Sequence, residues 1–150
     1  MGSFAVDARQ FPLDGACNPH VERKTARVRC VAAHAQICFE GHEKRDEFVT
    51  ALYENQATLT EDGVYELASA HVPRPELEAC VGSADTARKL REDIEAALPY
   101  DADGTPIVVV NGRRGTSFGP FLLATVLTHG GDSHPAFASL PAPNPQAHLH

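Results

Sequence analysis

The chain has 150 residues, and its 20 acidic and 13 basic side chains give a formal net charge of −7. This length suits one domain, and a hydrophobic fraction of 43% can build a core, which excludes wholesale disorder. The acidic balance argues against a nucleic-acid-binding protein, which needs a basic face. No apolar run approaches the roughly 20 residues of a membrane-spanning helix. Residues 1–7 show no export signal.

The first two thirds of the chain are predicted to be mainly helical. A weak alternation over residues 4–11 predicts a short strand, which leads into a loop. Apolar residues then recur at helical spacing, with Thr60 and Ser83 as N-caps and Pro99 as a terminator. The predicted helices cover residues of about 24–41, 44–55, 61–68, a short stretch through 77–80, and 84–98.

The last third begins with a predicted hairpin. Residues 107–110 are the best strand candidate, and Asn111-Gly112 is the strongest hairpin signal in the chain. Residues 113–118 would form the second strand of the hairpin, and a closing helix would follow near residues 121–129. Four of the eleven prolines lie in the last sixteen residues, which predicts a disordered or polyproline-like tail over 131–150. The predicted fold class is α/β, with a helical block of about 24–98 inserted between strands.

The four cysteines are Cys17, Cys30, Cys38 and Cys80, and none forms a C-x-x-C pair. Zinc-ribbon and dithiol redox motifs are therefore absent. Cys30 and Cys38 lie eight residues apart on one predicted helix, about 12 Å along its axis, and cannot bond to each other. Buried free thiols are the favoured interpretation. A structural disulfide from Cys17 to Cys30 or Cys38 is the alternative, and no cysteine is expected to be catalytic.

Three ordered segments carry a resemblance to a known family. They are residues 11–19 with the Cys- and Ala-rich helix that follows, residues 52–59 with the later Cys80 helix, and residues 104–113, Gly-Thr-Pro-Ile-Val-Val-Val-Asn-Gly-Arg. Together, over about residues 4–130, they resemble the DsbA-like branch of the thioredoxin superfamily. The likeness is strongest to thioredoxin domains found beside, or fused to, vitamin K epoxide reductase-like membrane proteins.

The resemblance implies a thioredoxin-like fold and a role in thiol–disulfide oxidoreduction. It implies cysteine-containing protein substrates, a vitamin K epoxide reductase-like membrane partner and a periplasmic or other extracytoplasmic location. It also implies that the Thr105–Pro106 bond is cis and that the Thr105 backbone pairs with an extended substrate peptide. Thr105 and Pro106 are thus the predicted substrate-binding residues. An ordinary trans proline at the start of a strand is the alternative.

The chain departs from the family at its N-terminus. The family's first strand and C-x-x-C helix should precede Phe4, where this sequence has only residues 1–3. We therefore expect a thioredoxin-like domain that is incomplete at its N-terminus and inactive in thiol–disulfide exchange with protein substrates. The alternative is a non-catalytic binding or assembly module that recruits a partner strand at the exposed sheet position.

Two further patterns suggest other chemistry. Residues 115–119 match the G-x-S-x-G nucleophile elbow, which makes a serine hydrolase at Ser117 a distant alternative. Asp132 and His134 are too close in sequence for the usual triad, and the domain is too small. His34 lies on an apolar helical face and is expected to be half-buried and not a metal ligand. No cofactor or metal site is indicated.

Overall fold

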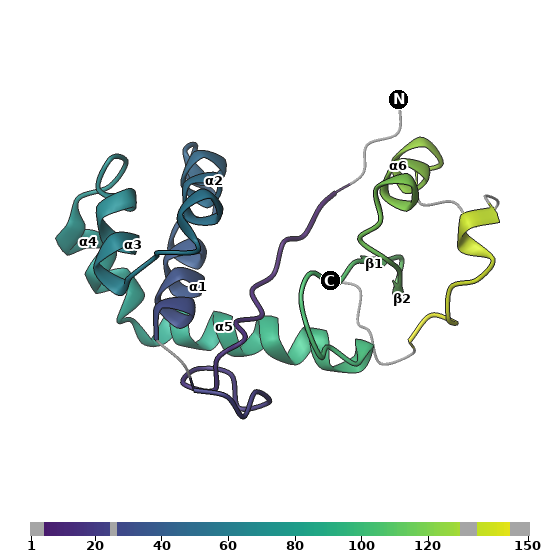
Figure 1. The fold of residues 1–150 in the computed structure, drawn as a ribbon, viewed down its shortest axis with the longest axis horizontal. Coiled ribbons are helices and arrows are strands. Elements are labelled where there is room, and N and C mark those ends of the chain that lie inside the picture. The colour runs from purple at the N-terminus through teal and green to yellow at the C-terminus, as the bar shows by residue number, and fades with distance from the viewer. Residues whose placement is uncertain (1–4, 25–26, 130–134, 145–150) are drawn as a thin grey trace. The chain divides into compact units, whose positions relative to one another are not determined.

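The computed structural model describes residues 5–24, 27–129 and 135–144. The chain divides into two compact units, and Figure 1 labels the helices and strands. The helical unit is Arg9–Ile94, and the hairpin unit is Met1–Ala8 with Glu95–His150. In chain order the elements are α1 Val28–Cys38, α2 Arg45–Asn55, α3 Glu61–Ala68, α4 Arg74–Val81, α5 Ala84–Ala97, the 3-10 helix η1 Leu98–Tyr100, β1 Val109–Val110, β2 Arg113–Arg114, α6 Gly119–Leu127 and the 3-10 helix η2 Pro135–Phe137.

The predicted α/β thioredoxin-like fold class is wrong. Within the described ranges the protein is mostly helical, and its sheet has two strands of two residues each. The strand predicted over residues 4–11 does not form over 5–11, where residues 5–9 are all exposed, and Phe4 lies outside the described residues. A strand needs a neighbour for its backbone hydrogen bonds and an apolar face to bury. Residues 5–9 bury no such face, so the weak alternation had nothing to stabilise it.

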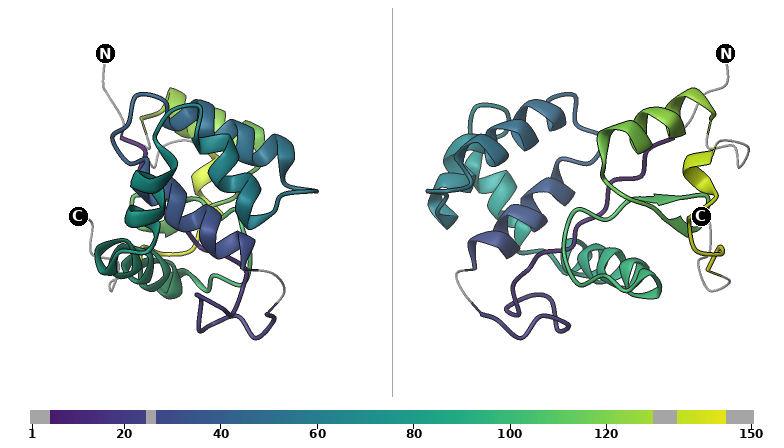
Figure 2. Two further views of the ribbon diagram at one scale, coloured as in Figure 1. Left: turned by 90° about the vertical axis from the view of Figure 1, so that its left-hand side faces the viewer. Right: turned by 45° about the vertical axis from the view of Figure 1, so that its right-hand side comes forward.

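The core of the helical unit forms where α1 to α4 pack together (Figure 2). The buried side chains of this cluster are Val31, Ala35, Phe39, Phe48, Leu52, Val64, Ala68, Leu77 and Val81. The Phe39 and Phe48 rings stack with centroids 4.2 Å apart. A second cluster joins α1 to α5 through Ala33, Ile37, Leu90 and Ile94. Helix α1 is therefore buried on more than one face, which its many small alanines allow.

Two helices begin directly after the N-cap residues that the sequence predicts. The Thr60 hydroxyl accepts a hydrogen bond from the Gly63 N–H at 3.0 Å, so Thr60 caps α3. The Ser83 hydroxyl accepts from the Thr86 N–H at 3.1 Å at the start of α5. Each hydroxyl satisfies a backbone donor that the helix itself leaves without a partner. Both predicted N-caps are confirmed.

The loop before α1 is held by buried polar side chains. Asp14 and Asn18 are both 0% exposed. The Asp14 carboxylate accepts from the Ala16 N–H at 2.9 Å, and the Asn18 amide donates to the Pro12 carbonyl at 3.0 Å. At Gly15 a Cβ atom would lie 2.2 Å from the Val21 carbonyl oxygen, so this turn requires glycine. These bonds explain why a polar loop can pack against the helices.

The hairpin unit is organised by the predicted turn. Asn111 and Gly112 have φ values of 50° and 76°, as a two-residue hairpin turn of the primed type requires. Val110 pairs with Arg113 in antiparallel register, so the hairpin prediction is confirmed, with strands shorter than the predicted 107–110 and 113–118. The predicted closing helix is α6. Its Phe121 packs against Phe137, with ring centroids 5.5 Å apart.

All four cysteines form disulfides, Cys17–Cys30 and Cys38–Cys80, with Cα–Cα distances of 5.9 and 6.1 Å. The favoured expectation of buried free thiols is wrong, and the alternative pairing of Cys17 with Cys30 is confirmed. Cys38 and Cys80 meet because α1 and α4 pack against each other. In the part of the chain that the structure describes, no helix combines the length and apolarity needed to cross a membrane.

Candidate polypeptide-binding edge of the hairpin unit

The predicted substrate-binding residues lie just before β1. The Thr105–Pro106 peptide bond is cis, as the family resemblance implies, and both residues are exposed. Proline has no backbone N–H to place in a sheet. The segment therefore offers its hydrogen-bonding groups through Thr105 and Ile107, the residues on either side of Pro106.

The backbone of this segment is not paired with the rest of the protein. Within the described ranges, neither the N–H nor the C=O group of Thr105 or Ile107 has a hydrogen-bond partner. The hairpin ladder begins at Val108, whose carbonyl accepts from the Gly115 N–H at 2.8 Å. The described sheet contains β1 and β2 alone, so the far side of β1 carries no strand. Residues 105–109 form what we call the binding edge, a stretch of backbone open along one side.

Arg113, on β2, anchors the C-terminal segment to the hairpin. Its guanidinium donates hydrogen bonds to three backbone carbonyls, those of Phe137 at 3.0 Å, Leu140 at 2.9 Å and Pro141 at 2.8 Å. Phe137 is only 1% exposed. The proline-rich tail predicted from composition thus includes a stretch, within 135–144, that packs against the hairpin. A guanidinium is planar and carries several N–H donors, so one arginine side chain can bind several backbone carbonyls at once.

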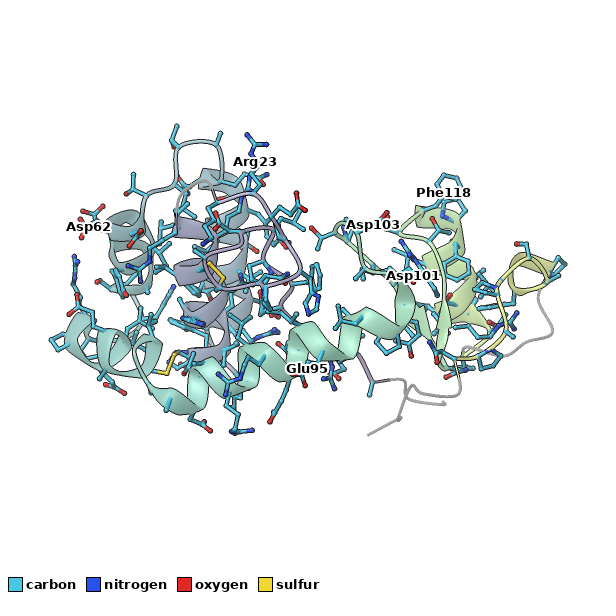
Figure 3. All side chains as sticks on the ribbon, turned by 90° about the horizontal axis from the view of Figure 1, so that it is seen from below. Arg23, Asp62, Glu95, Asp101, Asp103 and Phe118 are labelled. Carbon is cyan, nitrogen blue, oxygen red and sulfur yellow. A yellow bond between two sulfur atoms is a disulfide. The ribbon has the colours of Figure 1, made fainter. Side chains whose placement is uncertain are left out.

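Arg114 anchors the segment that precedes the binding edge. Its guanidinium donates to the carbonyls of Tyr100 and Asp101, both at 2.7 Å. It also lies 3.4 Å from the Asp103 carboxylate. Figure 3 shows Asp101 and Asp103 on the loop that leads from α5 toward β1. Both arginines of β2 are therefore hydrogen-bonded to backbone carbonyls of the protein. These bonds hold the hairpin, and with it the open binding edge, in place.

Helix α6 leaves an unusual amount of apolar surface uncovered. Residues 115–128 contain no charged side chain. Phe118 is 65% exposed, Leu123 59% and Leu127 70%, and Leu122 and Val126 add smaller areas. Figure 3 labels Phe118 at the start of this helix. A helix that is apolar on nearly every side normally lies in a core, and a contiguous exposed apolar patch marks an interaction surface.

A pocket of about 380 Å³ lies beside Arg114 in the hairpin unit. It is lined by Pro99, Tyr100, Asp101, Gly112, Arg114, Pro141, Ala142, Pro143 and Asn144. The Asn144 N–H donates to the Gly112 carbonyl at 3.0 Å and closes one wall. Sequence reasoning missed this pocket because the tail was expected to be disordered. The signal that pointed to it was the pair of arginines directly after the turn.

Within the described ranges, the remaining predicted residues show no catalytic or metal-binding arrangement. Ser117 is exposed and, among the described residues, contacts neither a histidine nor a carboxylate; Asp132 and His134 lie outside those ranges. His34 is half-buried, and burial, with a smaller effect of the Arg27 charge, lowers the pKa of its imidazole. No cluster of three or more metal-ligating side chains occurs in the described ranges.

Comparisons with protein-family models, with curated proteins and with solved structures found no match. The resemblance to DsbA-like proteins therefore stays a prediction from the three ordered segments. The geometry of the binding edge, the anchoring arginines and the exposed face of α6 are the observations on which a function can be argued.

Proposed function

We propose that the hairpin unit binds an extended segment of another polypeptide, which adds a strand along the binding edge. The observation that carries this proposal is the unpaired backbone of Thr105 and Ile107. A peptide laid beside these residues would satisfy their N–H and C=O groups, which is how strand addition supplies affinity. The anchored β2 side reduces the conformational entropy that binding would cost.

Side chains near the edge support an apolar preference in the bound peptide. Val109 is 39% exposed, and the uncovered residues of α6 belong to the same unit. A strand presents alternate side chains to opposite faces. A peptide with apolar residues at every second position would therefore suit this unit best. By the family resemblance its natural ligands would be cysteine-containing proteins, and its partner a vitamin K epoxide reductase-like membrane protein.

We infer that this binding is non-catalytic, as a DsbA-like relative without C-x-x-C would be. Reduction of a protein disulfide needs an activated thiolate and a resolving cysteine at the place where the client binds. All four cysteines belong to the helical unit and are bonded in pairs. The chain is therefore expected to leave the rate of insulin reduction by dithiothreitol unchanged. Turnover above the dithiothreitol background would refute the non-catalytic assignment.

Fluorescence anisotropy of a labelled alternating valine–threonine peptide, titrated with the full chain, tests the binding itself. Ile107→Pro removes one N–H of the edge and breaks no hydrogen bond of the described structure. It should weaken binding about tenfold, which is the effect of one intermolecular hydrogen bond. The matched control is Ile107→Ala, which shortens the side chain and keeps the N–H.

The peptide supplies a second control. N-methylation of alternate residues removes the N–H groups along one side and leaves the side chains unchanged. Strand addition predicts that methylating the side facing the protein abolishes binding and that methylating the other side does not. Equal binding of both methylated peptides, or equal affinities of Ile107→Pro and Ile107→Ala, would reject the binding edge.

The same open edge also supports the alternative of an assembly module, in which the added strand comes from a second copy of the chain. Sedimentation velocity over a range of concentrations separates the two functions. A dimer that Ile107→Pro dissociates would favour assembly. A monomer that binds the labelled peptide would favour recognition of a different polypeptide.

A further inference from the structure

The two disulfides of the helical unit differ in exposure. In Cys17–Cys30, Cys17 is half-buried, whereas Cys30 is buried, with 6% of its surface exposed. In Cys38–Cys80, both residues are half-buried. An attacking thiolate must reach one sulfur, and the other sulfur must leave as an anion. Burial hinders both steps at Cys30, because it blocks approach and disfavours a charged sulfur. In Cys38–Cys80 neither residue is fully buried, so the approach of a thiolate and the departure of a charged sulfur are less hindered there.

The polar neighbours of the two disulfides are of opposite kinds. The Cys17 sulfur lies 3.8 Å from the carbonyl oxygen of Asp14, an acceptor whose partial negative charge would repel a thiolate. The Thr86 hydroxyl oxygen lies 3.5 Å from the Cys80 sulfur and 3.7 Å from the Cys38 sulfur. A disulfide sulfur carries no hydrogen, so the Thr86 hydroxyl must be the donor in these contacts.

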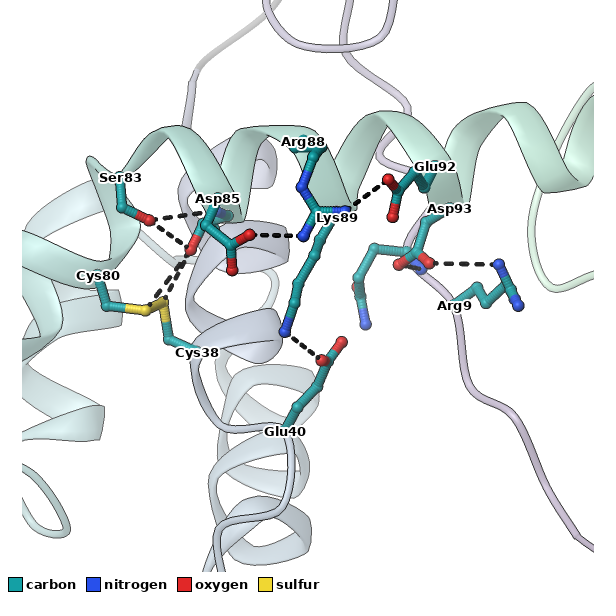
Figure 4. Close-up of polar contacts among 12 residues, drawn as sticks. Arg9, Cys38, Glu40, Cys80, Ser83, Asp85, Arg88, Lys89, Glu92 and Asp93 are labelled. Atoms are coloured by element: carbon teal, nitrogen blue, oxygen red, sulfur yellow. Dashed lines mark hydrogen bonds and ion pairs between the residues drawn. A yellow bond between two sulfur atoms is a disulfide. The ribbon is translucent and has the colours of Figure 1, made fainter. Parts of the chain in front are cut away.

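A short relay of hydrogen bonds orients the Thr86 hydroxyl, and Figure 4 labels Ser83, Cys38 and Cys80 at this place. The Ser83 hydroxyl donates to the Thr86 hydroxyl oxygen at 3.1 Å, so the hydrogen of Thr86 is left for the sulfurs. The Thr86 N–H in turn donates to the Ser83 oxygen at 3.1 Å. Thr86 is only 3% exposed, so little water competes for its hydroxyl. The donor is therefore preorganised before any sulfur becomes charged.

The Thr86 hydroxyl counteracts the partial negative charge of two helix C-termini. Cys38 is the last residue of α1, and Cys80 lies in the last turn of α4. Carbonyl groups at helix C-termini disfavour a negative sulfur. On α5, Asp85 is paired with Arg88, and Lys89 is paired with Glu40. The Thr86 hydroxyl contacts both sulfurs and would stabilise a thiolate at this position.

We infer that Cys38–Cys80 is a thiol-exchange site that accepts small thiols, whereas Cys17–Cys30 is a closed structural bond. The thiolate of the small thiol attacks the Cys38 sulfur, the Cys38–Cys80 bond breaks, and its electron pair leaves on Cys80. The product is a mixed disulfide on Cys38 and a thiolate on Cys80, which accepts a hydrogen bond from Thr86 and then a proton from solvent. The Thr86 hydroxyl reaches both sulfurs, at 3.5 Å from Cys80 and 3.7 Å from Cys38, so attack on Cys80 with Cys38 leaving follows the same course.

A second molecule of the small thiol completes the exchange. Its thiolate attacks the outer sulfur of the mixed disulfide and releases Cys38. Overall two small thiols lose two electrons and form their own disulfide, and the protein gains two electrons and two protons as two cysteine thiols. The step opens the covalent link between α1 and α4. The site belongs to the helical unit and does not involve the binding edge, so its test is independent of peptide binding.

The test exposes the oxidised full chain to reduced glutathione and quenches samples with N-ethylmaleimide for peptide mass spectrometry. Glutathione should appear on one cysteine of the Cys38–Cys80 pair and maleimide on the other, at least tenfold faster than either label appears on Cys17 or Cys30. In guanidinium chloride the two disulfides should react at similar rates, because the folded surroundings are gone. Equal rates in the folded chain, or faster opening of Cys17–Cys30, would overturn the assignment.

Two variants test the hydroxyl. Thr86→Val keeps the shape of the side chain, removes the donor, and should slow the opening of Cys38–Cys80 about tenfold. Thr86→Ser keeps the hydroxyl and should retain the wild-type rate. Circular dichroism at the temperature of the assay checks that both variants remain folded. If Thr86→Val reacts as fast as the wild type, or Thr86→Ser as slowly as Thr86→Val, the proposed role of the hydroxyl is wrong.

Discussion

The helical unit and the hairpin unit differ in how completely they bury their apolar side chains. The helical unit packs its large side chains into two clusters and holds both disulfides. The hairpin unit buries Phe121 and Phe137 but leaves Phe118, Leu123 and Leu127 largely exposed. Surface that a unit cannot bury internally is available to a partner. The difference supports the proposal that the hairpin unit binds a partner and that the helical unit serves as the packed scaffold.

The strongest test of this contrast is a pair of truncations, one in each unit. Phe48 is fully buried and stacks on Phe39, so Phe48→Ala should lower the free energy of unfolding of the helical unit by about 3–5 kcal/mol. Leu123, in the hairpin unit, is 59% exposed, and Leu123→Ala should change the free energy of unfolding of that unit by less than about 0.5 kcal/mol. Urea denaturation followed by circular dichroism measures both. A comparable loss for Leu123→Ala would mean that the α6 face is already covered.

The two disulfides should contribute unequally to the same unit. They close loops with sequence separations of 13 for Cys17–Cys30 and 42 for Cys38–Cys80. Loop-closure entropy predicts losses of roughly 3 kcal/mol for the double variant Cys17→Ala/Cys30→Ala and roughly 4 kcal/mol for Cys38→Ala/Cys80→Ala. Denaturant titrations of the two double variants give the values. A larger loss for the shorter loop would show that native packing, and not chain entropy, dominates.

The smallest expected effect is a pH dependence of the helical unit through His34. Burial lowers the pKa of this imidazole from its ordinary value of 6.5 in the folded chain. The unfolded chain therefore binds more protons, and stability rises with pH until about 6.5 and is lost as the pH falls below it. His34→Gln should flatten this part of the stability curve. An unchanged curve between the two proteins would assign the dependence to another group.

Signals that act over a few residues were predicted correctly. Asn111-Gly112 forms the turn because both residues tolerate positive φ, which the geometry of a two-residue hairpin demands. Thr60 and Ser83 cap helices because their hydroxyls reach a backbone N–H three residues ahead. In each case the interacting groups are neighbours in the chain, so the outcome hardly depends on the rest of the protein.

Predictions that required distant partners failed or were missed. The strand predicted over residues 4–11 does not form within the described part, 5–11, and β1 comprises only Val109 and Val110 of the predicted 107–110. The pairing of Cys38 with Cys80 was not foreseen, because nothing in their spacing shows that α1 and α4 pack together. The candidate site follows the same division: Thr105 and Pro106 were named from the sequence, whereas their unpaired backbone is visible only in the structure.

Amino-acid order was sufficient for the positions of two N-caps, the hairpin turn and the absence of C-x-x-C, because each depends on residues within one or two turns of chain. Packing was needed to choose the disulfide partners, to direct the Thr86 hydroxyl at two sulfurs and to bring the Arg113 guanidinium to the carbonyls around Phe137. Those contacts join residues 6 to 48 positions apart. Their geometry depends on how whole elements bury apolar surface, which local patterns do not encode.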